Sequence, residues 1–151
     1  MHTKLLTVAF FILAAISTDA QLKEFKSTGD WQLIGQVKYA GTPKASLKYL
    51  VTGGDTTYLL TMRDDRYELK EFFSITFQNI NGTFQQFSEI LFSFFEKEHR
   101  KDKSYERTFS LGNTMVHVQH YKKLTGASIM LTTKEGYILL TKGELERLFG
   151  K

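Results

Sequence analysis

Residues 71–99 read EFFSITFQNINGTFQQFSEILFSFFEKEH, and this stretch decides the fold because it holds eight of the thirteen phenylalanines. Phe73, Ile75 and Phe77 alternate with polar residues, which is the period of a half-buried strand. Asn81-Gly82 predicts a turn, because both residues tolerate the positive φ angle that a tight turn needs. The stretch is therefore predicted to form a strand, a turn and a long amphipathic helix.

The helix is predicted over about 83–98, and Thr83 with Gln86 predicts a capping box at its start. Apolar residues then recur at helical spacing over an arc of about 140°, which is wide enough for a core face. These residues are Phe84, Phe87, Ile90, Leu91, Phe94 and Phe95. Phe92 lies about 60° outside the arc, so we expect either that a loop or the second sheet covers it or that it contributes to a homodimer interface.

Alternating residues and glycine-rich turns predict four strands on either side of this helix. In the first, Trp31, Leu33, Val37 and Tyr39 form the apolar alternation, with Gly35 interrupting it. The next two cover about 47–51 and 57–62, and the fourth begins near Leu69. The later strands are expected at 105–111, 114–121, 127–133 and 137–140, before a short C-terminal helix at about 142–149.

The C-terminal helix repeats the pattern of the first one at an offset of 58 residues, because Thr141 and Glu144 take the places of Thr83 and Gln86. Each half of the chain then consists of four strands followed by a helix. The predicted fold class is therefore α+β, with two ββββα units of antiparallel strands and a possible internal duplication of 31–98 in 104–149.

This element order, over residues 31–149, resembles the architecture of the Whirly family and of related single-stranded-DNA-binding coactivators. In that group two such sheets pack against each other with their helices beside them. The resemblance implies single-stranded nucleic-acid binding, with Lys38, Lys48, Lys122 and Lys123 as phosphate contacts. The chain lacks a signature stretch of lysines and glycines, so the resemblance concerns the fold more than the function.

Residues 1–20 have the order of a secretory signal peptide: a basic start, an apolar run of twelve residues that is too short to span a bilayer, and a small residue at Ala20. Cleavage there leaves one domain, 21–151, beginning at Gln21. We expect an exported bacterial protein, periplasmic or extracellular, because small secreted eukaryotic domains usually rely on disulfides and this chain has no cysteine. The opening also resembles exported proteins of Bacteroidota.

The net charge of +4 makes the chain only mildly basic, whereas a dedicated nucleic-acid binder carries a dense stripe of Lys and Arg. The predicted export argues against nucleic-acid binding as well. The densest charged run, EKEHRKDKSYER at 96–107, is predicted to be a solvated helix C-terminus, with a basic contact surface as the alternative.

No catalytic motif is found, and no enzyme, cofactor or metal is predicted; a hydrolase is kept only as a remote alternative. G-x-S-x-G is missing, and Gly53-Gly54-Asp55 lacks the residues of a phosphate loop. His117 and His120 point to opposite faces of a strand, so they do not converge on a metal. Asp64-Asp65 lies between two arginines and is interpreted as a neutralised surface turn.

Aromatic side chains make up 14% of the chain and are the remaining candidates for binding. Those expected at a ligand site or an interface are Trp31, Tyr49, Phe72 and Phe92. The sequence therefore predicts a small exported, non-catalytic binding or interaction module, acting through an aromatic surface or by self-association, with Whirly-like single-strand binding as the alternative.

Overall fold

The computed structural model of the chain describes residues 29–66, 71–123 and 126–151. The predicted signal peptide, Gln21 and the predicted start of the fourth strand at Leu69 lie outside the described residues, as does the side chain of Lys123. In the described part no helix is long and apolar enough to cross a membrane.

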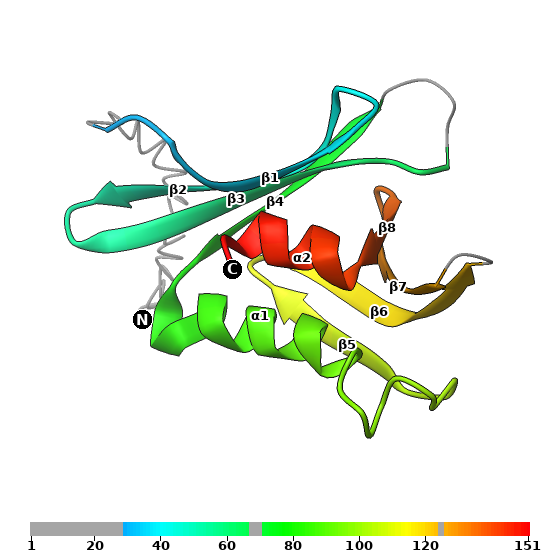
Figure 1. Ribbon diagram of the computed structural model, residues 1–151. Coiled ribbons are helices and arrows are strands. Elements are labelled where there is room, and N and C mark those ends of the chain that lie inside the picture. The colour runs from blue at the N-terminus through cyan, green and yellow to red at the C-terminus, as the bar shows by residue number, and fades with distance from the viewer. Residues whose placement is uncertain (1–28, 67–70, 124–125) are drawn as a thin grey trace, which may run out of the picture.

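Two antiparallel sheets of four strands form the protein, and each is followed by a helix (Figure 1). Sheet A contains β1 (Gln32–Tyr39), β2 (Thr42–Thr52), β3 (Asp55–Arg63) and β4 (Phe72–Gln78), and a 3-10 turn (Ile80–Gly82) leads from it into α1 (Thr83–Ser93). Sheet B contains β5 (Glu106–Leu111), β6 (Thr114–Lys123), β7 (Gly126–Thr132) and β8 (Tyr137–Thr141), followed by α2 (Lys142–Phe149). Strand order follows chain order in both sheets, so the predicted α+β class with two ββββα units is confirmed.

The two helices begin differently although their sequences match. At α2 the capping box forms: the Glu144 amide donates to the Thr141 hydroxyl, and the Glu144 carboxylate accepts the Thr141 amide at 2.8 Å. At α1 the predicted capping box is wrong, because Gly82, with a left-handed φ of 76°, occupies the N-cap and Thr83 already lies inside the helix. The Asn79 side chain accepts the amide of Phe84 instead, at 3.1 Å.

Helix α1 ends at Ser93, earlier than the predicted 98. The Phe94 side chain is fully buried and packs edge-on against Tyr105 and His120, so the chain leaves the helix axis to reach sheet B. The Ser93 hydroxyl donates to the carbonyl of Ile90 at 2.7 Å, which satisfies a group left open at the helix end. The charged run that follows is therefore not a helix C-terminus.

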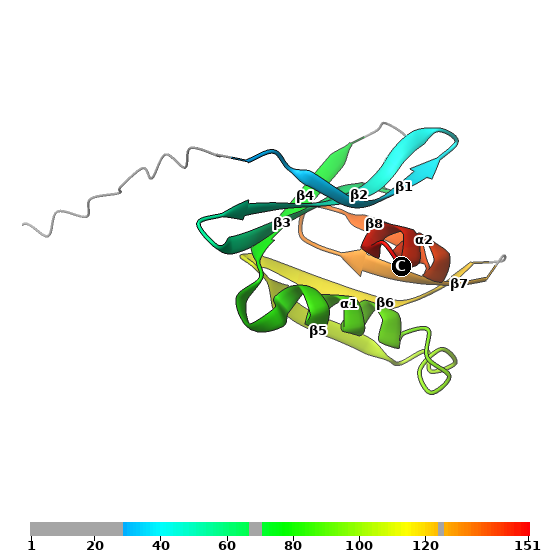
Figure 2. The ribbon, with the colours of Figure 1, turned by 60° about the vertical axis from the view of Figure 1, so that its left-hand side comes forward.

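The two units interlock, because each helix packs on the sheet of the other unit. Phe87 of α1 contacts Phe77 of sheet A and Phe109 of sheet B, and it is 1% exposed. Helix α2 lies between the two sheets in Figures 1 and 2, and it approaches β1 so closely that a Cβ atom at Gly35 would stand 2.0 Å from the carbonyl oxygen of Arg147. Glycine is therefore required at this position.

The predicted apolar face of β1 is wrong. Val37 is 1% exposed, whereas Leu33 is 56% and Tyr39 is 65% exposed. The pairing with β2 shifts between Leu33 and Gly35, which leaves Ile34 as an extra residue. A bulge of this kind changes the face on which the following side chains point, so a strict alternation cannot hold across it.

Side chains from β2 and from the turn after β3 hydrogen-bond to the outer edge of β8. The amide of Tyr137 donates to the Asp64 carboxylate at 3.3 Å, and the amide of Leu139 donates to that of Asp65 at 2.9 Å. The Lys44 ammonium donates to the carbonyl of Leu139 at 2.6 Å. Because unpaired edge strands template further strand pairing, these contacts both join the sheets and close an edge.

Asp64 is buried, at 3% exposure, so the prediction that it lies in a surface turn is wrong. Burial by itself raises the pKa of this carboxyl, but hydrogen bonds from the Arg66 side chain and amide and from the Tyr137 amide outweigh that effect. The pKa of Asp64 is lowered overall. Its carboxylate and Arg66 form an ion pair at 2.6 Å, as expected for a charge that is buried only because it has a partner.

Candidate functional site

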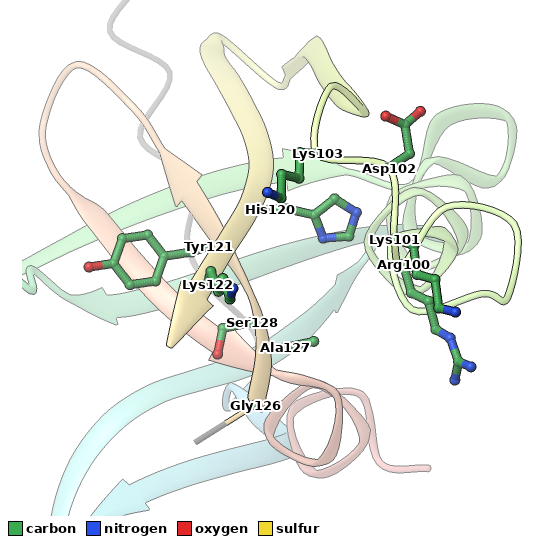
Figure 3. A pocket seen from close by; sticks show the side chains of 10 residues that line it. All are labelled: Arg100, Lys101, Asp102, Lys103, His120, Tyr121, Lys122, Gly126, Ala127 and Ser128. Atoms are coloured by element: carbon green, nitrogen blue, oxygen red, sulfur yellow. The ribbon is translucent and has the colours of Figure 1, made fainter. Parts of the chain in front are cut away.

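A pocket of about 760 Å³ lies between the segment that follows α1 and the far end of the β6–β7 hairpin (Figure 3). We call residues 96–104 the basic loop. The loop contributes Arg100, Lys101, Asp102 and Lys103, and β6 contributes His120 and Lys122. These six side chains define what we call the basic pocket.

Aromatic contacts and hydrogen bonds hold the basic loop against sheet B. The ring of His99 stacks on Tyr105 with centroids 4.0 Å apart and planes 6° from parallel. The carbonyl of His99 lies 3.0 Å from Nε2 of His120. Because a carbonyl only accepts hydrogen bonds, Nε2 of His120 must carry a proton. His99 belongs to the run that was predicted to be a solvated helix C-terminus, but it is half-buried and fixes the loop on β6.

Asp102 closes the turn within the loop. Its carboxylate accepts the hydroxyl of Ser104 at 2.6 Å and the amide of Ser104 at 2.9 Å. These hydrogen bonds, the hydroxyl first, lower the pKa of Asp102, and the nearby His99 and His120 add to the lowering. The carboxylate is consequently ionised at neutral pH and is the one anion among the six defining side chains.

Positive charge dominates the basic pocket. Its four cations against one carboxylate give a net charge of +3, in a chain whose net charge is +4. Among the residues that the structure describes, no ion pair involves Arg100, Lys101, Lys103 or Lys122, and all four are exposed. A concave surface lined by charges of one sign concentrates the field and attracts counter-ions.

Figure 3 shows the Arg100 and Lys101 side chains extending to one side of the loop and the Asp102 carboxylate pointing to the opposite side. The Asp102 carboxylate therefore points away from these two cations. Lysine and arginine side chains carry donors and no acceptors, so the pocket suits a ligand that presents acceptor oxygens. Carboxylate, phosphate and sulfate groups have this chemistry.

The aromatic residues predicted to bind do not come together. Trp31 is 38% exposed ahead of β1, and Phe72 is 48% exposed on the outer face of sheet A. Tyr49 is half-buried on the core side, where its hydroxyl donates to Gln32 and its ring lies 6.5 Å from that of Tyr58. Tyr58 is buried.

The C-terminus covers Phe92. Its ring packs edge-on against Phe149 with centroids 5.9 Å apart, and the Lys151 ammonium stands 4.4 Å from the ring centroid. Lys151 also donates to the hydroxyl of Ser88 at 3.0 Å, and Ser88 is buried. The covering element is therefore α2 with the residue that ends the chain, and not the loop or second sheet that was expected; a homodimer through Phe92 stays a prediction.

The structure separates the four lysines that were predicted as phosphate contacts. Lys48 pairs with Leu33 and Leu59 across sheet A and shares their outer face, while Lys38 is exposed near the other end of β1. Lys122 lies in the basic pocket of sheet B. The side chain of Lys123 is outside the described residues.

Sequence reasoning did not single out Arg100, Lys101 and Lys103. Their signal was the density of cations between 97 and 103 together with the lysines at the end of β6, two segments whose proximity depends on the fold. His120 packs against Phe94 on the inner face of β6, where Val116 and Val118 are buried. His117 hydrogen-bonds Thr108 at 2.8 Å on the other face, so the two histidines point to opposite faces as predicted. Within the described ranges, no three His, Asp or Glu side chains are grouped so that they could hold a metal ion.

Comparison of the chain with protein-family models, with curated proteins and with solved structures found no match.

Proposed function

We propose that this protein is a non-catalytic binding module and that it takes up an anionic ligand in the basic pocket. The observation that carries the proposal is the set of four cations around one recess, none of them in an ion pair within the described residues. Cations that serve only solubility are usually interspersed with carboxylates. Here the carboxylate that lines the pocket, Asp102, is hydrogen-bonded to Ser104 and turned away, and among the described residues no ion pair joins Glu96 or Glu98 of the basic loop to these cations.

Two double variants of equal charge test this proposal. Lys101→Gln/Lys122→Gln removes two cations from the pocket, and Lys38→Gln/Lys48→Gln removes two from sheet A, so each lowers the net charge from +4 to +2. On a phosphocellulose column the pocket variant should elute at clearly lower salt than the wild type, while the sheet A variant should elute close to the wild type. Equal shifts for both variants would mean that net charge alone controls retention.

A second candidate function is single-stranded nucleic-acid binding on the outer face of sheet A, as the Whirly-like element order implies. It is favoured by the exposed Leu33 opposite Lys48 and by Trp31 nearby in the chain, because bases stack on aromatic side chains while cations contact the phosphates. Trp31 is the only tryptophan, so its fluorescence should change when a single-stranded oligonucleotide binds there. The affinity should then fall steeply with salt. No binding at low salt would remove this candidate.

We further propose that the protein is exported, to the periplasm or the cell exterior, and that its mature form begins at Gln21. The order of residues 1–20 supports this proposal. Intact-mass measurement of protein recovered from outside the cytoplasm tests it, since retention of the first twenty residues would contradict cleavage after Ala20.

A further inference from the structure

We infer that the ligand of the basic pocket carries at least two tetrahedral oxyanion groups, phosphate or sulfate, held apart by its own covalent frame. The inference rests on the proposed function and specifies the chemistry of the ligand. Three observations carry it: the size of the pocket, the origin of its cations from two separate elements, and the contacts that fasten the loop presenting most of them.

The size excludes a bare ion as the best-fitting ligand. The pocket volume of about 760 Å³ lies inside the range of about 300–1,000 Å³ that is typical of sites for drug-sized molecules. One phosphate group would fill only a small part of it.

The cations come from two elements that are far apart in the sequence. Arg100, Lys101 and Lys103 belong to the basic loop, whereas Lys122 belongs to β6 on the opposite wall. A ligand with two separated oxyanion groups can contact both walls at once, and each group then gains its own charge-assisted hydrogen bonds. Arg100 adds a planar fork of donors, which pairs with two oxygens of one phosphate or sulfate group.

The loop is organised before any ligand binds. The stack of His99 on Tyr105, the contact of the His99 carbonyl with His120 and the bonds from Ser104 to Asp102 tie three points of the basic loop together. A site fixed in this way loses little conformational entropy on binding. The part of the chain that carries three of the cations is therefore fixed on sheet B, which favours a ligand with separated anionic groups over a diffuse attraction to any anion.

Titration calorimetry at constant ionic strength tests the inference, with tripolyphosphate and inorganic phosphate as probes. Tripolyphosphate should bind more tightly by a factor of about ten or more, because one additional charge-assisted contact is worth at least that factor. Lys122→Gln should remove most of this preference, since it takes away the cation of the second wall. Lys134→Gln, with the same charge change in the turn between β7 and β8, should leave the preference intact.

Equal affinity for the two probes, or a preference that survives Lys122→Gln, would overturn the inference. The proposed function would stand in that case if the pocket variant still loses retention on phosphocellulose, so the two failures are distinguishable. A heparin-derived tetrasaccharide serves as the sulfated counterpart of tripolyphosphate. Preference for either multivalent probe over inorganic phosphate supports the inference, and the tighter of the two identifies the source of the oxyanion groups. Circular dichroism of each variant confirms that it is folded.

Discussion

Replacing Gly35 by alanine should destabilise the protein more than any other single methyl addition to β1. The new Cβ would stand 2.0 Å from the carbonyl oxygen of Arg147 and 2.5 Å from that of Leu148, and ordinary contact begins at 3.4 Å. Both neighbours are backbone atoms of α2, so no side-chain rotation relieves the overlap. The helix must withdraw from sheet A by about 1.4 Å, the difference between 3.4 and 2.0 Å.

The size of the effect follows from what that withdrawal loosens. Leu145, Leu148 and Phe149 on the inner side of α2 are at most 6% exposed. A gap of about 1 Å already forfeits up to half of a dispersion contact, and overpacking of a core typically costs about 1–3 kcal/mol. Because a whole helix face is affected, we expect a loss of about 3 kcal/mol, at the upper end of that range.

Gly143→Ala in the same helix is the matched control. A Cβ atom there meets only Nη1 of Arg147, at 3.9 Å, so the change should raise stability by about 0.5 kcal/mol through the higher helix propensity of alanine. Urea denaturation followed by far-ultraviolet circular dichroism measures both variants. A loss below about 1 kcal/mol for Gly35→Ala, with an unchanged denaturant slope, would refute the close packing of α2 on β1.

Thr141→Ala should lower the free energy of unfolding by about 1 kcal/mol, and Thr83→Ala by less than half of that, because only Thr141 caps its helix. Thermal unfolding measures both variants, and equal losses of stability would contradict this assignment. Phe87→Ala should cost about 3 kcal/mol through lost burial and a cavity, and a denaturation-derived loss below about 1 kcal/mol would show that the core face of α1 is misassigned. Burial by itself raises the pKa of Glu144, but hydrogen bonds from Lys44 and Thr141 and the charge of Lys44 lower it overall, so Glu144 binds fewer protons in the folded than in the unfolded chain. The contribution of Glu144 to stability should be complete above the unfolded pKa of about 4.3 and should be lost as the pH falls through the lower folded pKa. The urea concentration at the unfolding midpoint should therefore fall less steeply from neutral to acidic pH for Glu144→Gln than for the wild type. Parallel curves for the two proteins would contradict this linkage.

The local pattern of the sequence was sufficient to predict the order of the elements. Phe73, Ile75 and Phe77 alternate with polar residues, and this pattern predicts a strand with one buried face whatever the strand packs against. All three residues are buried. The connections between consecutive strands of each sheet have at most eight residues, which is too short for the crossover that parallel neighbours need, so both sheet orders follow from chain order. The C-terminal helix was likewise predictable, because a capping box and a Gly150 end are local signals.

Features that depend on distant partners were not predictable from the same patterns. Thr83 and Thr141 stand in equivalent sequence contexts, yet only Thr141 caps a helix, because the conformation of Gly82 carries Thr83 into the helix interior. Asp64 belongs to a charged stretch that is typical of a surface turn. It is nevertheless buried, because Tyr137 of β8, which lies 73 residues further along the chain, donates its amide to the carboxylate.

The candidate site belongs to this second group. The basic loop and Lys122 line one pocket only because Phe94 leaves the helix to pack between Tyr105 and His120. Periodicity determines which face of an element is apolar, since it depends on residues a few positions apart. Which elements meet, and therefore which charges share a pocket, is determined by the packing of side chains that are distant in the sequence, and here the exchange of helices between the two sheets decides it.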